Sequence, residues 1–207
     1  MAHSNIDTMT LSGGVACLDF VNTGLEVDSI PVERLHCYDD ILTMTERLSL
    51  MQSFDLLTLR NRSKADPLHA QNCLKRGIAL REVLNRIFHF VADRNIQKIS
   101  PKDITELNTW RLQALAGQGF VAQADRLALE WGDANDLCMQ PFWGLTLSAA
   151  ELLQSQSLKY VRRCAGCDWF FLDQSKSHRR KWCDMQTCGS SAKARRYYQR
   201  QKDKTQI

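Results

Sequence analysis

Four cysteines near the C-terminus constrain this chain more than any other feature. Cys164 and Cys167 form a CxxC pair, Cys183 and Cys188 form a CxxxxC pair, and 15 residues separate the two pairs. Two such knuckles can bring four thiolates to one tetrahedral centre, which is the ligand set of structural zinc. A segment this short buries too little apolar surface to fold alone, whereas zinc binding contributes its free energy directly to folding. The spacing therefore predicts one structural Zn²⁺ ion held by all four cysteines.

Three other roles for these cysteines agree less well with the sequence. Two disulfides would require an oxidising compartment, whereas we expect a reducing one, because no signal-peptide pattern is recognised and the other four cysteines stand singly. A four-thiolate iron centre usually uses two CxxC pairs instead of this asymmetric arrangement. His178 could replace one thiolate, although the cysteine set is complete without it. Because four thiolates leave no position for water, we expect no chemistry at the metal.

The charge of the chain is divided unevenly between its two parts. Residues 159–207 hold 13 Lys and Arg against four Asp, a net charge of +9, while residues 1–158 hold 14 Lys and Arg against 19 acidic residues, a net charge of −5. Four thiolates around a divalent ion would leave the C-terminal part at about +7. Such a positive field attracts a polyanion, and nucleic acid is the natural candidate.

A basic helix is predicted after Gly189. The run SSAKARRYYQRQKDK begins with serine and contains good helix formers, which predicts a helix from about 191 to 202. Ala194 and Tyr198 share a flank that is expected to rest on the zinc centre. Interleaved Arg and Tyr are typical of phosphate clamping with some base or sugar contact. The predicted nucleic-acid contacts are Arg179, Arg180, Lys181, Lys193, Arg195, Arg196 and Arg200.

Residues 1–157 read as a mostly helical domain and residues 158–207 as a separate finger module. A short helix is expected after Asp39 and Asp40, and a long helix after the start signal Asp66–Pro67. The apolar stripe of the long helix consists of Cys73, Gly77, Leu80, Leu84, Ile87 and Val91. A further helix starts at Ser100–Pro101 and stops at Gly117, and packs antiparallel to the long one.

Weaker patterns complete the predicted fold. The apolar run 15–21 is interpreted as a buried strand, followed by a turn at 22–24, although Asp19 and Asn22 could instead line a polar notch. Residues 26–34 are loop-like, 120–131 form a weak hairpin or a connector, and Pro141 opens a helix that runs to Ser155. We therefore predict a mainly α protein with a short N-terminal strand and a zinc-ribbon-like finger.

No catalytic constellation emerges from the remaining residues, and we expect no enzyme. Four cysteines stand singly and are predicted to be inert core residues: Cys17, Cys37, Cys73 and Cys138. Four histidines are equally isolated: His3, His36, His69 and His89. Three tryptophans are assigned to core packing, or else to a small ligand cavity: Trp110, Trp131 and Trp143. Without a signal peptide or an apolar run approaching 18 residues, the protein is expected to be cytoplasmic, with no membrane partner.

The segment WFFLDQSKSHRRKWCDMQTCGSSAKARRYYQR resembles the bacterial CGNR zinc finger, and CLDFVNT at 17–23 resembles the opening of the ABATE domain that accompanies it. One departure is that the tetrapeptide that gives the finger its name reads Cys188, Gly189, Ser190, Ser191 here. The resemblance implies a regulator of transcription, with DNA binding in the finger and a ligand or stress signal sensed by the N-terminal domain.

The sequence thus predicts a zinc-dependent, DNA-binding transcriptional regulator, with Trp169, Phe170 and Trp182 shaping its finger. DNA is preferred to RNA because of the resemblance. The rival hypothesis is a protein-interaction clip, in which the acidic N-terminal domain docks the basic module without nucleic acid. Specific recognition by one small module would require a homodimer or a second site.

Overall fold

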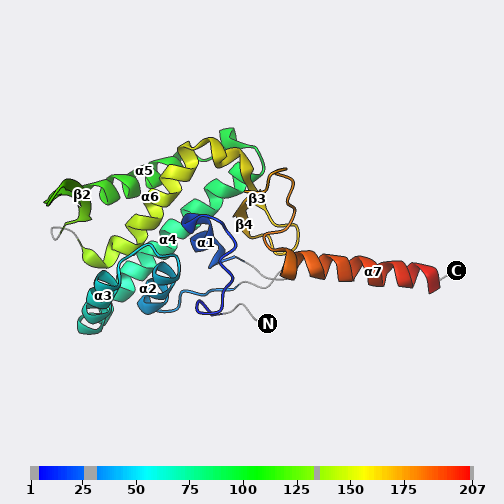
Figure 1. Ribbon diagram of the computed structural model, residues 1–207, viewed down its shortest axis with the longest axis horizontal. Helices are drawn as coiled ribbons and strands as arrows, with labels where there is room; N and C mark the ends of the chain where they lie inside the picture. The colour runs from blue at the N-terminus through cyan, green and yellow to red at the C-terminus, as the bar shows by residue number, and fades with distance from the viewer. Residues whose placement is uncertain (1–4, 26–31, 133–135, 206–207) are drawn as a thin grey trace.

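The computed structural model of the 207-residue chain describes residues 5–25, 32–132 and 136–205 (Figure 1). These residues form seven α-helices, short 3-10 turns and two small antiparallel sheets. Six helices gather into one body, and the last, α7 (Ser190–Thr205), extends away from it (Figure 1). The fold is mainly α, as the sequence predicts. Within the described residues, no helix combines the length and the apolarity needed to cross a membrane.

The long helix α4 (Pro67–Ala92) lies at the centre of the molecule. Its start is the predicted one: Asp66 Oδ1 accepts a hydrogen bond from the backbone N–H of His69 at 3.0 Å, and Pro67 is the first helical residue. Every residue of the predicted apolar stripe is buried. Five helices contact α4: α1 (Ala16–Asn22), α2 (Tyr38–Arg47), α3 (Ser53–Ala65), α5 (Pro101–Ala116) and α6 (Gln140–Gln154).

Gly77 allows α6 to approach α4 closely. A Cβ atom at Gly77 would overlap the ring of Phe142, which is itself fully buried. A helix of this length would ordinarily avoid an interior glycine, because glycine costs about 1 kcal/mol relative to alanine. The close approach of the Phe142 ring explains why glycine is used here.

The predicted N-terminal strand is wrong, because residues 16–22 form the helix α1. A short, continuous apolar run is compatible with a buried strand or a buried helix, and periodicity alone does not separate the two. In the structure α1 contacts α4, α6 and the strand β4 (Phe170–Leu172), so that it is enclosed on several sides. Asn22 is the last residue of this helix and not the start of a turn.

The structure also bears on the predicted hairpin at 120–131 and on the segment between the first two predicted helices. The weak hairpin is confirmed: β1 (Gln118–Gln123) pairs with β2 (Arg126–Trp131) in an antiparallel register. Helix α3 was not predicted, since it is polar at most positions and buries few side chains, among them Leu56 and Leu59. Residues 26–31 of the predicted loop, and His3, lie outside the described residues.

The finger module packs into the helical body. The 3-10 turn η3 (Gln156–Tyr160) leads into β3 (Val161–Arg163), which pairs with β4. The buried side chains of β4 belong to the same apolar cluster as the helical core, and Phe170 lies 6.3 Å from Phe88 between ring centroids. The proposed division at 157/158 therefore separates two modules of the sequence, and the side chains of both modules pack into one continuous apolar core.

Candidate metal centre

The first cysteine knuckle follows strand β3. Cys164 donates its backbone N–H to the carbonyl of Trp169 at 2.9 Å, and its own carbonyl accepts from the N–H of Asp168 at 3.1 Å. Asp168 has a φ of 59°, a conformation that aspartate tolerates better than most residues. Gly166 N–H points to Cys164 Sγ at 3.4 Å. These bonds close a tight turn that directs Cys164 and Cys167 toward the same point.

The second knuckle is a π-helical turn, η4 (Met185–Gly189), which leads directly into α7. Asp184 caps this turn by accepting hydrogen bonds from the N–H of Thr187 at 2.7 Å and from its hydroxyl at 2.9 Å. These bonds to Thr187 lower the pKa of the Asp184 carboxyl. The N–H of Ala165 donates to the carbonyl of Lys181 at 3.0 Å and ties the two knuckles together.

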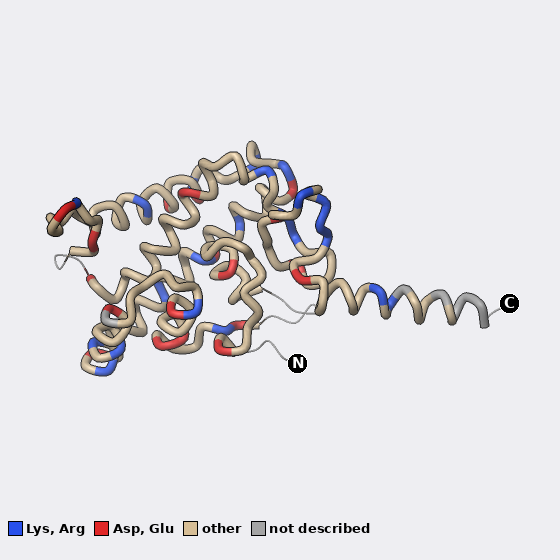
Figure 2. Tube along the Cα trace, viewed as in Figure 1, with Lys and Arg blue, Asp and Glu red and all other residues tan. Residues whose placement is uncertain are grey.

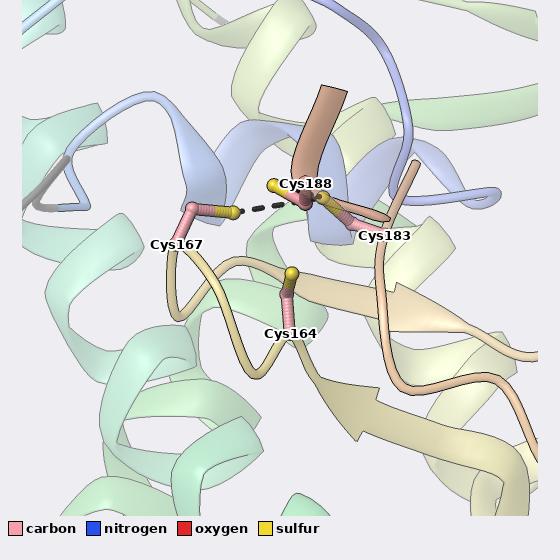
Figure 3. Close-up of side chains that lie close together, drawn as sticks. All are labelled: Cys164, Cys167, Cys183 and Cys188. Carbon is pink, nitrogen blue, oxygen red and sulfur yellow. Dashed lines mark hydrogen bonds between the residues drawn. The ribbon is translucent and has the colours of Figure 1, made fainter. Parts of the chain in front are cut away.

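The two knuckles bring the four sulfur atoms together, all within 4.8 Å of one another (Figure 3). Cys167 Sγ lies 3.5 Å from Cys183 Sγ, and Cys183 Sγ lies 3.8 Å from Cys188 Sγ. Zinc–sulfur bonds of about 2.3 Å in a tetrahedron place the sulfurs about 3.8 Å apart. The separations therefore suit one tetrahedral zinc ion. All eight cysteines of the chain are free thiols, and His178 is not part of the cluster.

The four thiol groups also shift one another's pKa values, because they lie close together. Hydrogen bonds from Cys167 and Cys183 lower the pKa of Cys164, whereas hydrogen bonding to Cys164 raises the pKa of Cys167 and raises that of Cys183 to about 12. Burial raises the pKa of Cys188. A divalent ion supplies the positive charge that four adjacent thiolates require.

The surroundings shield the sulfurs on most sides. Cys164 and Cys183 are buried, whereas Cys167 and Cys188 are half-buried beside a cavity of about 220 Å³ lined by Thr10, Trp169 and Arg195 among others. The predicted shaping residues Trp169 and Phe170 are buried, and Trp182 is half-buried near Gly166 and Gly189. Ser190 and Ser191 are exposed, and Ser190 Oγ donates to the carbonyl of Met185 at 3.2 Å.

Asp173 organises the loop that carries the first basic residues. Its Oδ1 accepts from the N–H and hydroxyl of Ser175 at 3.1 and 2.7 Å, and its Oδ2 accepts from the N–H of Arg180 at 2.9 Å. His178 Nδ1 lies 2.8 Å from the Asp173 carbonyl, and its ring stacks on Tyr160 at 3.6 Å. Sequence reasoning missed Asp173, although an aspartate two residues before a serine is a turn signal.

Figure 2 marks the Lys and Arg positions along the chain in blue. The predicted basic residues differ in how far their side chains are exposed. Arg179, Lys181, Lys193 and Arg195 are exposed. Arg180 is half-buried: its guanidinium donates to the carbonyl of Cys183 and lies 5.1 Å from the centroid of the Phe171 ring. The side chains of Arg196 and Arg200 lie outside the described part of the structure, although both residues belong to α7.

The predicted packing of α7 on the metal centre is wrong in its detail. Ala194 is exposed, and Tyr198 is 66% exposed with its ring against that of Tyr197, at an angle of 74° between the ring planes. Among the α7 residues whose side chains the structure describes, Ala192, in the first turn, is buried. Only the start of the helix contacts η4, because α7 then leaves the body of the molecule (Figure 1).

The predicted inert cysteines and isolated histidines also need correction. Cys17, Cys73 and Cys138 are buried, but Cys37 is exposed at the N-cap of α2. His69 is not isolated, because Cys73 and Cys138 lie close to it in space. The signal that could have found this group is His69 and Cys73 four residues apart on one helix, which places them on one face.

The fold and the site together define a mainly α protein that ends in a four-cysteine finger module. A family model of the ABATE domain, described as "Putative stress-induced transcription regulator", matches residues 14–156, and a model of the CGNR zinc finger matches residues 160–201. The chain belongs to the ABATE family and carries a CGNR zinc finger. Neither description is of an enzyme. No match to the chain was found among curated proteins.

Proposed function

We propose that this chain is a zinc-dependent DNA-binding regulator of transcription, in which the finger loop and α7 contact the phosphate backbone. The observation that carries the proposal is the direct connection between the metal knuckle and the basic helix. Cys188 lies within η4, and α7 begins at Ser190, two residues later. An ion held by the four sulfurs would therefore fix the first turn of α7, and with it the direction in which its basic side chains project.

The charges of the module support a polyanionic partner. Lys193 and Arg195 lie exposed near the start of α7, close to the sulfur cluster in sequence, and Arg195 lines the cavity beside it. Arg179 and Lys181 are exposed in the loop before Trp182. Guanidinium groups bind phosphate in a bidentate manner, which makes arginine well suited to clamping a backbone.

Arg180 takes a different part in this proposal. Its guanidinium already has an acceptor in the carbonyl of Cys183 and a face contact with Phe171. We propose that Arg180 chiefly holds the loop against the second knuckle and orients its neighbours Arg179 and Lys181. The proposed phosphate contacts of Arg196 and Arg200 rest on the sequence of α7 alone.

The test is a binding titration with labelled duplex DNA, single-stranded DNA and RNA at several salt concentrations. Neutralising about 4–6 phosphates predicts a slope of about −4 to −5 in a plot of log affinity against log salt. Lys193→Ala with Arg195→Ala should weaken duplex binding at least about tenfold and reduce the slope by about 2. The matched control is Lys98→Ala with Lys102→Ala, which removes the same charge from exposed positions on the helical body.

The outcome also separates DNA binding from the rival hypothesis. Unchanged binding in the α7 variant, or no binding by zinc-loaded protein at low salt, contradicts the proposal and favours a protein-interaction clip. Tighter binding to single-stranded RNA than to duplex DNA favours an RNA-binding module, whose aromatic side chains stack on unpaired bases.

We further propose that the N-terminal part senses a small molecule. A cavity of about 590 Å³ lies between α3, β2 and the start of α6, with Leu59, Arg62, Trp131 and Gln140 among its lining residues. Its size is within the range of about 300–1,000 Å³ that is usual for ligand sites. Trp131 provides the readout, since a bound ligand should change its fluorescence. A compound that stabilises the wild type but not Arg62→Ala would support the assignment.

A homodimer is proposed through the β1–β2 hairpin. Its large apolar side chains face solvent: Phe120 is 74% exposed, Leu127 67% and Leu129 53%. Exposed apolar groups that lie together mark an interaction surface more often than isolated ones do. Light scattering on a sizing column should return a dimer that Phe120→Ser with Leu127→Ser converts to a monomer. Monomer alone for the wild type at micromolar concentration contradicts this part of the proposal.

A further inference from the structure

A second group of metal-binding side chains lies in the helical body, away from the finger. The ligand atoms of His69, Asp136 and Cys138 all lie within 4.8 Å of one another. Cys73 adjoins them: its Sγ is 3.5 Å from His69 Nε2 and 3.4 Å from Asp136 Oδ2. One imidazole, one carboxylate and two thiols therefore converge from two separate parts of the chain.

The fold holds these residues in place from both sides. His69 and Cys73 share one face of the first turns of α4, four residues apart. Asp136 and Cys138 belong to the 3-10 turn η2 (Leu137–Met139) and its N-cap, where Asp136 Oδ1 accepts from the N–H of Cys138 at 3.2 Å. Tyr38 fixes this turn by donating its buried hydroxyl to the carbonyl of Cys138 at 2.7 Å. The donor atoms are thus arranged before any ion binds.

We propose that this cluster is a second metal site, which takes a divalent first-row transition metal of the zinc class. The ligands are His69 Nε2, a carboxylate oxygen of Asp136 and the sulfur of Cys138, with Cys73 as the fourth. A mixed imidazole, carboxylate and thiolate set suits borderline-soft ions such as Zn²⁺ and excludes Mg²⁺ and Ca²⁺, which prefer oxygen. Binding releases each thiol proton to solvent as the metal–sulfur bond forms, and it also displaces the Nε2 proton that His69 donates to Asp136.

An ion pair between His69 and Asp136 does not by itself account for the arrangement. The two groups are 2.8 Å apart, with side chains 45% and 29% exposed, and a partly exposed ion pair contributes at most about 1 kcal/mol. Nor does such a pair need two thiols beside it. The additional sulfur donors are what make the group a coordination site.

The site differs from the finger in its access to solvent. The finger cluster contains four thiolates, two of them from buried cysteines, whereas this cluster includes an exposed imidazole. Its ion should therefore exchange more readily than the ion of the finger. Bound metal would also join the N-terminus of α4 to the segment preceding α6, so that occupancy stiffens this part of the body. The proposal does not depend on nucleic-acid binding by α7.

The test uses the full-length chain with zinc already in the finger and Co²⁺ as the probe. Co²⁺ in a thiolate-containing tetrahedral site absorbs visible light, so one further equivalent should give a saturable absorption. His69→Ala and Asp136→Asn should each weaken Co²⁺ binding at least about tenfold, because even outer-shell changes often cost 10–100-fold. Asp136→Asn keeps an oxygen for the Cys138 N–H, which preserves the turn.

The matched control is His36→Ala with Cys37→Ser, an exposed histidine and cysteine outside the cluster. It should bind Co²⁺ as the wild type does, and elemental analysis should find the finger zinc retained in every variant. The proposal is overturned if wild-type protein develops no such absorption. It is equally overturned if folded His69→Ala and Asp136→Asn proteins, checked by circular dichroism, titrate like the wild type.

Discussion

Asn22 and Phe170 form a reciprocal pair of hydrogen bonds that joins the N-terminal helix to the finger strand. Asn22 Nδ2 donates to the carbonyl of Phe170 at 2.9 Å, and the N–H of Phe170 donates to Asn22 Oδ1 at 2.8 Å. Both residues are fully buried. The Asn22 side chain, 148 positions earlier in the sequence, thereby provides a hydrogen-bond partner for both the N–H and the carbonyl of Phe170. A neighbouring strand in a sheet would do the same.

Asn22→Ala should therefore destabilise the whole protein. It leaves a buried N–H and a buried carbonyl without partners, each at a cost of about 1–3 kcal/mol, so that the free energy of unfolding should fall by about 2–6 kcal/mol. Urea unfolding measures this loss. Asn108→Ala, an exposed asparagine on α5, is the matched control and should change little. A loss below about 1 kcal/mol in Asn22→Ala would show that water replaces the missing partner.

The sequence predicted an element correctly where a few adjacent residues determine its structure. The Asp66–Pro67 and Ser100–Pro101 starts were recognised because capping is a property of a few adjacent residues. Helix α1 was missed because its environment is made by α4, α6 and β4, which are distant in sequence. Helix α3 was missed because it buries too few side chains to show a pattern.

The same distinction applies to the site. The four finger cysteines lie in two short motifs, so their spacing in the sequence indicated their convergence. The second cluster joins His69 to Asp136 and Cys138, some 67 residues further along the chain, and no spacing rule links such positions. Asn22 was assigned to a turn because its partner, Phe170, is visible only in the folded chain.

The buried carboxyl of Asp19 should make stability depend on pH. Burial raises its pKa to about 6 from an ordinary value of 3.8, although Gly13 N–H donates to it at 2.8 Å. The folded state thus binds the proton more tightly than the unfolded state. This contribution is fully present below about pH 4 and is lost as the pH rises through about 6.

Asp19→Asn removes this dependence, since the amide keeps an acceptor for Gly13 without a titrating charge. Relative to the wild type, the variant should gain stability as the pH rises from 4 to 7, by at most about 3 kcal/mol. Urea unfolding of both proteins is measured at each pH. Any effect of zinc loss in acid on the free energy of unfolding is then common to both proteins and cancels from their difference. Asp125→Asn, at an exposed position, provides the control. Parallel stability curves for Asp19→Asn and the wild type would contradict the prediction.

Alanine substitution of the glycine inside α4 and of the glycine inside α6 should change the stability of the protein in opposite directions. Gly77→Ala would press a methyl group into the Phe142 ring and should cost about 1–3 kcal/mol. Gly144 in α6 has no atom within 4 Å of an added Cβ, so Gly144→Ala should stabilise the protein by about 0.5–1 kcal/mol. Thermal unfolding measures both. Phe142→Leu combined with Gly77→Ala should cost less than the two separate changes added together.

Removal of the finger metal should affect the two knuckles differently. The strand β4 is fixed independently of the metal, by Asn22 and by a hydrogen bond of 2.8 Å from the N–H of Leu172 to the carbonyl of Gly13. The second knuckle contacts the first through the sulfurs and the Ala165–Lys181 hydrogen bond, and the Arg180 side chain links it to the Phe171 ring of β4. After chelation, amides of 183–190 should lose at least about tenfold in hydrogen-exchange protection, while those of 170–172 keep theirs.

Hydrogen exchange followed by mass spectrometry, with and without a zinc chelator, resolves the two segments. Cys188→Ser should reproduce the chelated pattern in 183–190, because it removes one ligand from the second knuckle only. Cys17→Ser, a buried cysteine outside the cluster, controls for the loss of a thiol as such. Equal deprotection of both segments would mean that the metal, and not the docking of β4 on α1, holds the finger to the body.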